Sequence, residues 1–349
     1  MIGPSSDLLQ RGEAGDPGAQ IALGRHYEGL DDVRKARGWF ARAAKAGSVE
    51  AMRLLALNLL GREPVVAADG VGILHTAAHR GDAQAAYVCG LLDTQSEALE
   101  RRWPIAIASL RDAAARGMPG ADRELELLTG NADEDSSSDA FDATAFAAAL
   151  RLEEISAAPR LYAIRNFLRP DLCDWLSEGA RQRLERASVY DPATGSNRIE
   201  RARSNSHLTF NVIDSNFIVM LLRDRIAATA RRPLVSLERT ALLHYDPGEA
   251  FAPHFDFLDT AIPAYAREVA EHGQRVATLL IYLNEDYEGG ETEFLELGLR
   301  HRASKGDALL FWNVDAAGAP DRRTFHAGRP TTRGEKWVLS QWVRGPGMR

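Results

Sequence analysis

The chain has 349 residues, of which 45% are hydrophobic and 26% are charged, and its formal net charge is −7. This length and composition are typical of a globular protein with about two domains, and the negative charge argues against binding of nucleic acid through its phosphates. No stretch approaches the roughly 18–20 apolar residues of a membrane helix, the N-terminus lacks the apolar part of a signal peptide, and only two cysteines occur, so we expect a cytoplasmic protein without disulfides.

The first third of the chain repeats itself. Glycines recur at steps of 32, 34 and 36 residues, and each of the last three closely follows a pair of alanines; these glycines are Gly15, Gly47, Gly81 and Gly117. Alanine lets helices approach closely, and glycine can end a helix in the left-handed conformation. A helix-rich period in the thirties therefore predicts an all-α solenoid of helix pairs.

Residues 22–29, ALGRHYEG, and residues 35–47, KARGWFARAAKAG, carry a more specific pattern. With them, the stretch from about 15 to 128 resembles the Sel-one-like repeats, which are relatives of the tetratricopeptide repeats. The resemblance implies that residues 1–128 form a helical repeat domain that binds proteins or peptides. The alternative is that the alanine-rich helices pack only against their own chain.

Residues 129–157 differ in composition from both flanks. Their first part, TGNADEDSSSDAF, contains no basic residue and three consecutive serines, which is typical of a solvated linker. The alanine-rich segment that follows predicts a short helix leading into a second domain at 158–349.

The second domain begins with a predicted strand and two helices. Residues 161–164 predict the strand, Asp171 is a candidate N-cap for the helix around it, and residues 216–230 have helical spacing. Apolar runs bounded by turn residues then predict strands at 237–245, 276–284, 308–314 and 336–343. This order indicates a jelly roll with supporting helices, so the whole chain is predicted to be an α+β protein of two domains.

His254 and Asp256 lie two residues apart within the aromatic run FAPHFDF. On their own they favour a strand with one polar face over a metal site. His326 adds a second histidine, and two histidines with one carboxylate bind one face of Fe(II) and leave positions open for a 2-oxo acid and dioxygen. Lys336 supplies the charge-assisted bond that a distal carboxylate of such an acid requires. Because alternate residues of a strand share a face, Lys336 and Trp342 are expected to line the same interior.

Three longer segments match one family in order. They are NFLRPDLCDWL at 166–176, HYDPGEAFAPHFDF at 244–257 and QRVATLLIYLNEDYEGGETEF at 274–294, and the strands around His326 and Lys336 follow. Residues from about 158 to 345 thus resemble the prolyl 4-hydroxylase branch of the Fe(II)- and 2-oxoglutarate-dependent dioxygenases. The resemblance implies a double-stranded β-helix, which is a jelly roll.

The resemblance also implies roles for individual residues. The iron ligands and catalytic residues would be His254, Asp256 and His326. Lys336 would hold the far carboxylate of 2-oxoglutarate, and the residues around this cosubstrate would be Tyr245, Thr292 and Trp342. Tyr282 fits a helper role and an ordinary strand aromatic equally well.

The substrate side matches more loosely. Residues 188–206 resemble the loop that closes over a peptide in this family, with Arg203 and Ser204 in its Arg-x-Ser pattern, and Arg275 matches a substrate-side arginine. A solvated basic loop explains its arginines, which include Arg198 and Arg201, at least as well.

Two departures from the family pattern concern the substrate. Phe251 stands where many members have tyrosine, and Arg329 stands where many have cysteine. Both leave the iron ligands unchanged, so they affect only which side chain is hydroxylated.

We therefore expect a dioxygenase that uses Fe(II), 2-oxoglutarate and dioxygen, with ascorbate as a candidate reductant. It would hydroxylate a C–H bond in a peptidyl, prolyl-type substrate that the repeats recruit, and neither nucleic acid nor a membrane is an expected partner. Two alternatives stay open: the same chemistry on a free amino acid or small metabolite, and a non-catalytic repeat scaffold with a vestigial barrel.

Overall fold

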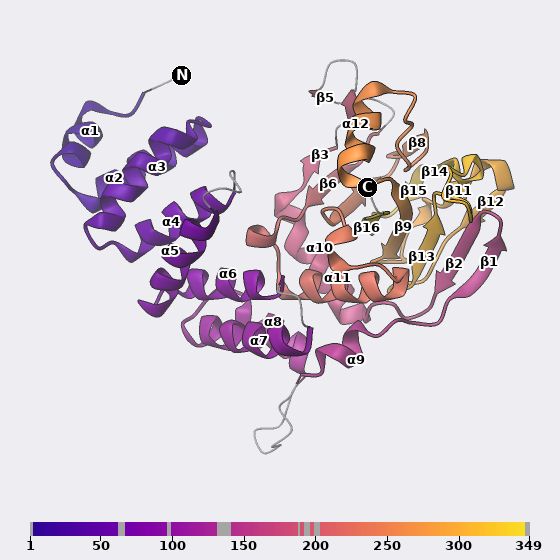
Figure 1. Cartoon of the computed structure of the whole chain (residues 1–349), viewed down its shortest axis with the longest axis horizontal. Coiled ribbons are helices and arrows are strands. Elements are labelled where there is room, and N and C mark those ends of the chain that lie inside the picture. Colours follow the sequence, from indigo (N-terminus) through magenta and orange to yellow (C-terminus); the bar gives the residue numbers. More distant parts are fainter. Residues whose placement is uncertain are drawn as a thin grey trace. The chain divides into compact units, whose positions relative to one another are not determined.

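The computed structural model describes residues 3–61, 67–95, 99–130, 141–187, 189–191, 196–198 and 203–345 (Figure 1). The chain divides into two compact units: residues 1–144 with 212–220 form the helical unit, and residues 145–211 with 221–349 form the unit that holds the sheets. Whether 129–157 is a linker stays a prediction, because residues 131–140 lie outside the described part. None of the described helices is long and apolar enough to cross a membrane.

The helical unit consists of consecutive helices, as the first third of the sequence predicts. Their bounds are α1 Ser6–Glu13, α2 Pro17–Gly29, α3 Val33–Lys45, α4 Val49–Leu60, α5 Ala67–His79, α6 Ala83–Asp93, α7 Leu99–Ala115 and α8 Ala121–Thr129. Neighbours in sequence pack on each other, with the largest contacts between α2 and α3, α4 and α5, and α6 and α7. The helices are therefore present, and their likeness to Sel-one-like repeats stays a prediction.

The repeated glycines share one conformation. They have positive φ angles, 95° for Gly15, 94° for Gly47, 98° for Gly81 and 77° for Gly117, which L-residues adopt only with strain. The residue after each of the first three glycines caps the next helix with its side chain; these caps are Asp16, Ser48 and Asp82. A glycine followed by a cap is thus a compact connector between helices, which explains why the pair recurs.

Small residues set how closely the helices pack. A Cβ added to Gly24 of α2 would lie 2.3 Å from the Phe40 ring of α3. A Cβ added to Gly38 of α3 would have no atom within 4 Å. Ala43, Ala44 and Ala51 form a small core cluster between α3 and α4. Close helix contact therefore depends on a few positions that lack side-chain bulk.

The helical unit also holds a buried carboxylate. Glu124 of α8 is 1% exposed, and it accepts hydrogen bonds from the Tyr87 hydroxyl at 2.5 Å and from the Ile218 N–H at 3.2 Å, at the start of α11 (Phe217–Ala230). Burial is the largest influence on this group and raises the pKa of Glu124 to about 7. The stability of this unit is therefore expected to depend on pH.

The second unit is built from two antiparallel sheets. The larger has the order β1-β2-β13-β9-β16-β7-β6-β3: β1 Glu153–Ala157, β2 Arg160–Ile164, β13 Ala308–Trp312, β9 Arg275–Tyr282, β16 Lys336–Arg344, β7 Ala241–Tyr245, β6 Ser206–Thr209 and β3 Glu185–Arg186. The smaller has the order β12-β11-β14-β8: β12 Leu299–His301, β11 Thr292–Phe294, β14 His326–Gly328 and β8 Phe251–His254. Two further pairs are β10 Glu288–Gly289 with β15 Thr331–Arg333, and β4 Val189–Asp191 with β5 Ser196–Arg198.

Side chains from both sheets meet in one core. Phe294 of the smaller sheet is fully buried and belongs to one cluster with Tyr282, Leu309, Phe311 and Val338 of the larger sheet. Two antiparallel sheets that share a core form the predicted jelly roll, and its helices are α10 Pro170–Ala180, α12 Pro263–His272, the short α9 Ala143–Ala147 and most of α11. The predicted α+β fold class is confirmed.

One local prediction needs correction. Asp171 is not the N-cap of α10, because Pro170 takes the first helical position and makes Arg169 the cap residue. Proline suits that position since its missing N–H would have no helical partner there. Asp171 instead pairs with the Arg169 guanidinium at 2.9 Å. The short helix predicted after the linker is present as α9, which ends at Ala147 before β1 begins.

Candidate functional site

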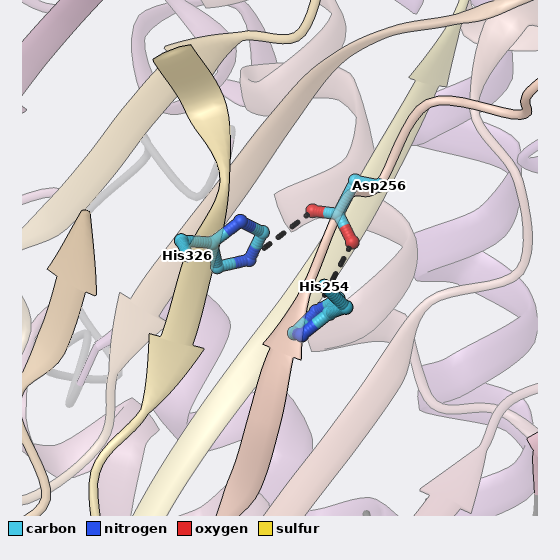
Figure 2. A group of neighbouring side chains, drawn as sticks. All are labelled: His254, Asp256 and His326. Carbon is cyan, nitrogen blue, oxygen red and sulfur yellow. Dashed lines mark ion pairs between the residues drawn. The ribbon is translucent and has the colours of Figure 1, made fainter. Parts of the chain in front are cut away.

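Two histidines and a carboxylate far apart in sequence converge on one point. β8 and β14 pair so that His254 lies directly opposite His326, and Asp256 follows just after β8. Nε2 of His254 lies 3.6 Å from one oxygen of Asp256, and Nε2 of His326 lies 3.7 Å from the other (Figure 2). The three possible ligand atoms all lie within 4.8 Å of one another.

Backbone carbonyls orient both histidine rings. Nδ1 of His254 lies 2.8 Å from the Ala252 oxygen, and Nδ1 of His326 lies 2.9 Å from the Thr324 oxygen. When Nδ1 donates its hydrogen to a carbonyl, the lone pair stays on Nε2, which is the atom that faces Asp256. The strand backbone therefore orients the Nε2 atoms of both rings toward the same point.

A hydrogen-bonded chain holds the carboxylate from behind. The Thr278 hydroxyl donates to Oδ2 of Asp256 at 2.6 Å, and the Asn313 side-chain amide donates to the Thr278 oxygen at 3.0 Å. Asp256, Thr278 and Asn313 are at most 4% exposed. Because Thr278 occupies Oδ2, Oδ1 is the freer oxygen for a metal ion.

The protonation states suit a divalent cation. Burial alone would raise the pKa of Asp256, but the two histidines and the Thr278 hydroxyl together hold it well below its usual range. Burial, and then the neighbouring His254, lower the pKa of His326 to about 4. At neutral pH the carboxylate is thus ionised and His326 is uncharged, which is the state in which both ligate metals. Two imidazoles and one carboxylate with open positions form a donor set that fits Fe(II).

These side chains face one pocket of about 630 Å³, its open mouth included. Alternate residues of β16 line it together, namely Lys336, Val338, Ser340 and Trp342. The predicted shared strand face is therefore confirmed. Tyr245 of β7 lies directly opposite Lys336 in the sheet and lines the same pocket.

Lys336 is a buried cation that forms no ion pair with a described residue. It is 3% exposed, and Nζ donates to the Gly290 carbonyl at 2.6 Å. Among the residues that the structure describes, no carboxylate forms an ion pair with it. Burial lowers the pKa of Lys336 to about 8, so most of it is protonated at neutral pH. A buried ammonium without an anion is costly, and an anionic ligand would relieve that cost.

Two hydroxyl groups complete this end of the pocket. Tyr245 and Thr292 both line it and are at most 4% exposed. Burial raises the pKa of Tyr245 to about 12, which keeps the phenol neutral and able to donate a hydrogen bond. Tyr282 is fully buried and shares a hydrogen bond of 2.9 Å with the Thr292 hydroxyl. Tyr282 therefore positions Thr292 instead of facing the pocket itself.

The predicted substrate residues take different places. Arg203 and Phe251 line the pocket, with the guanidinium 4.8 Å from the centre of the Phe251 ring. The Ser204 hydroxyl is held by the backbone of Ala250, through bonds of 2.8 and 3.2 Å. Arg275 lines an adjoining hollow, where it stacks 3.6 Å from the Trp342 ring.

Three other arginines belong to the sequence prediction: Arg198, Arg201 and Arg329. Arg201 and the side chain of Arg198 are outside the described part of the chain. Arg329 pairs with Glu293 at 2.9 Å.

Sequence reasoning missed three residues of this site. Thr278 and Asn313 hold Asp256 from behind, and Arg239 lines both the pocket and the adjoining hollow. Thr278 lies on the inner face of β9, and its position in an apolar strand was the one signal available. Nothing in the local sequence singles out Arg239.

A second group of possible ligands lies on the other side of β7. His244, Asp246 and Glu249 also bring three atoms within 4.8 Å of one another. Glu249 is already engaged, by Arg186 at 2.6 Å and by the Asp246 N–H at 3.0 Å, and His244 lies 3.4 Å from Glu335. These neighbours indicate a network of charged groups, whereas the first group presents its atoms to a pocket.

Comparisons with known proteins concern mainly the part of the chain that holds this pocket. The family model described as the 2OG-Fe(II) oxygenase superfamily matches residues 240–344. Prolyl 4-hydroxylase 1 of Arabidopsis thaliana is 33% identical over 207 residues, covering 55% of this chain and 71% of that protein. Probable prolyl 4-hydroxylase 10 of the same plant is 32% identical over 212 residues, with the same coverage.

Among solved structures, the viral collagen prolyl hydroxylase vCPH of Paramecium Bursaria Chlorella virus-1, in complex with 2OG, is 25% identical, with a TM-score of 0.41. The match covers 53% of this chain and 96% of that one. The sequence identity to the plant enzymes, and their coverage, show the family. The chain belongs to the prolyl 4-hydroxylase family of 2OG-Fe(II) oxygenases, and it is a dioxygenase that depends on Fe(II) and 2-oxoglutarate.

Proposed function

We propose that His254, Asp256 and His326 are the iron ligands and catalytic residues of this dioxygenase. The proposal is supported by their facing atoms, their burial and the hydrogen bonds that leave both Nε2 atoms free. When bound, iron and 2-oxoglutarate supply the dioxygen chemistry that hydroxylates a C–H bond. The protein's own part is to fix the ligands and to keep the pocket largely closed to water.

Lys336 is the proposed partner of the far carboxylate of 2-oxoglutarate. The observation that carries the assignment is its buried ammonium, which faces the same pocket as the triad and has no carboxylate partner among the described residues. Tyr245 and Thr292 would donate hydrogen bonds beside it, and Trp342 would form part of the wall farther along β16. A cation in a pocket of low polarity binds a carboxylate more strongly than it would in water.

The substrate is a peptidyl proline in this proposal. Two plant proteins similar to this chain are named prolyl 4-hydroxylase 1 and probable prolyl 4-hydroxylase 10. Arg203 and Phe251, which line the mouth of the pocket, are the proposed substrate contacts, with Ser204 shaping the backbone beside them and Arg275 farther out. Phe251 in place of the usual tyrosine offers an apolar contact without a hydroxyl.

An anaerobic titration tests the iron and cosubstrate assignment. Fe(II) and 2-oxoglutarate are added to the full chain, and the weak visible charge-transfer band of the chelate is followed. Wild type should develop the band, His254→Ala should not, and His79→Ala, which removes an exposed histidine of α5, should behave like wild type. Absence of the band in wild type would overturn the assignment.

The helical unit is proposed to recruit the protein that carries the proline. Support comes from its solenoid-like run of helix pairs, which in other proteins presents extended binding surfaces. A nanobody raised against α2–α5 should slow hydroxylation of a protein substrate and leave that of a short proline peptide unchanged. Equal inhibition of both, or of neither, would count against recruitment.

A further inference from the structure

A second hollow continues outward from the iron pocket. The two share lining residues, namely Arg203, Arg239, Ala241 and Trp342, so they are contiguous. The outer hollow is larger and more polar, and Val235, 91% exposed, stands on its rim. Only a substrate with chain on at least one side of the reacting residue can occupy both spaces at once.

The lining of the outer hollow is basic, although the chain as a whole has a net charge of −7. Among the described residues it contains four arginines and a single carboxylate, Glu238. That carboxylate is already used, since Arg275 binds both of its oxygens, at 2.6 and 3.0 Å, and Arg344 lies 2.5 Å from one of them. Arg344 is further paired with Glu268. The other two arginines of the lining, Arg203 and Arg239, take no part in these ion pairs.

Neither of these two arginines forms an ion pair with a carboxylate in the part of the chain that the structure describes. Arg203 is partly buried, with Nε donating to Asn205 at 3.2 Å and its guanidinium over Phe251. Arg239 is exposed and stands where the two hollows join. A guanidinium at such a junction offers two parallel N–H groups to a carboxylate.

We propose that the outer hollow selects peptides with an acidic residue close to the reactive proline, and that Arg239 is the residue that recognises its carboxylate. The inference rests on the proposed function, because it assigns the substrate class of that same site. It also favours a peptide over a free amino acid, since a free amino acid in the iron pocket would leave the outer arginines unmatched.

The test uses the full chain loaded with Fe(II) and 2-oxoglutarate and pairs of synthetic nonapeptides. Each peptide has one central proline in an alanine and serine background, with glutamate or isosteric glutamine on either side of it. Succinate formation then gives kcat and KM. Wild type should show a KM about tenfold or more lower for a glutamate peptide, the usual effect of one charge-assisted hydrogen bond. The advantage should shrink with added salt.

Substitutions separate recognition from general damage. Arg239→Gln should remove most of the preference for glutamate, and Arg239→Glu should reverse it in favour of a lysine peptide. Arg151→Gln, a change at an exposed arginine outside both hollows, should keep the wild-type preference. Reversal by Arg239→Glu requires a folded, active enzyme, so loss of fold cannot imitate it.

Two results would overturn the inference. One is equal KM values for glutamate and glutamine peptides in wild type. The other is a preference that survives in Arg239→Gln. Both are distinct from failure of the proposed function, in which the chelate band itself would be missing and no peptide would be hydroxylated.

Discussion

Replacing Lys336 with methionine should raise the stability of the ligand-free protein. Methionine keeps most of the aliphatic stem and removes an ammonium that is 3% exposed. Burial lowers the pKa of Lys336 from 10.5 to about 8, which corresponds to about 3 kcal/mol of destabilisation of the folded state at neutral pH. Loss of the bond to Gly290 offsets about 1 kcal/mol of this. We expect a net gain of about 1–2 kcal/mol.

The gain has a defined pH window. Between pH 8 and 10.5 the unfolded chain binds more protons at this lysine than the folded chain, so wild-type stability rises with pH there. The difference between Lys336→Met and wild type should therefore be full below pH 8 and should shrink as pH rises toward 10.5.

The same substitution should weaken 2-oxoglutarate binding. A hydrogen bond between a cation and a carboxylate contributes about 1.5–3 kcal/mol, so the dissociation constant should rise about 10- to 100-fold. Urea denaturation of the ligand-free chain and the anaerobic chelate titration measure the two effects. Lys305→Met is the control: it removes a partly exposed lysine paired with Asp174 at 2.6 Å and should change neither quantity by much.

The two effects must have opposite signs for the reasoning to hold. A Lys336→Met protein that is less stable without ligand would refute the idea that the lysine is held in an unfavourable place. An unchanged affinity for 2-oxoglutarate would refute its assignment to the far carboxylate.

Three further predictions concern single positions. Thr278→Val removes the hydroxyl that donates to Asp256 and should weaken Fe(II) binding about 10- to 100-fold in an anaerobic titration, whereas Thr278→Ser should restore most of it. The pKa of Glu124 is raised to about 7, so its contribution to stability is present below pH 4.5 and is lost as pH rises through 7. Glu124→Gln should flatten the pH dependence of the unfolding free energy of the helical unit, as measured by urea denaturation. Gly24→Ala should lower the free energy of unfolding of the helical unit by about 1–3 kcal/mol because the added methyl group overpacks the contact with Phe40, and thermal denaturation followed by circular dichroism should show a lower midpoint. Gly38→Ala should raise the free energy of unfolding by up to about 1 kcal/mol.

Each of these has a contradicting outcome. Equal iron affinity in Thr278→Val and wild type would mean that the hydroxyl does not hold the carboxylate. A wild-type stability that does not fall between pH 4.5 and 7.5 would contradict the raised pKa of Glu124. Similar effects of the two glycine substitutions would show that close packing against Phe40 is not limiting.

Local patterns were enough to predict much of this molecule. The recurring glycines with positive φ angles are a short-range signal, so the helices on either side of Gly15, Gly47 and Gly81 could be found from sequence. The apolar runs that form β7, β9, β13 and β16 are equally local. The prediction of Asp171 as N-cap was wrong because Pro170 takes the first helical position, which moves the cap two residues toward the N-terminus. The preference of proline for that position thus outweighed the preference of aspartate for the cap.

The candidate site shows where local reasoning stops. His254, Asp256, His326 and Lys336 could be proposed because the resemblance to a family linked distant segments. The spacing of His254 and Asp256 alone favoured a polar strand face. Arg239 could not be found, because its position at the junction of two hollows depends on how β7 lies beside β16. Its significance also depends on which carboxylates already form ion pairs. The pairs of Glu238 with Arg275 and Arg344 are visible only in the folded structure.

In the proposed assignment, the charges of the loaded iron site balance without the outer arginines. Fe(II) and Lys336 together offset Asp256 and the two carboxylates of 2-oxoglutarate. Arg203 and Arg239 are then in excess at the mouth through which the substrate enters. A neutral peptide would leave both unmatched beside a half-buried surface, whereas a carboxylate next to the proline would match them. The basic mouth of an acidic protein is therefore explained by the substrate, and screening by salt should raise KM for acidic peptides far more than for neutral ones.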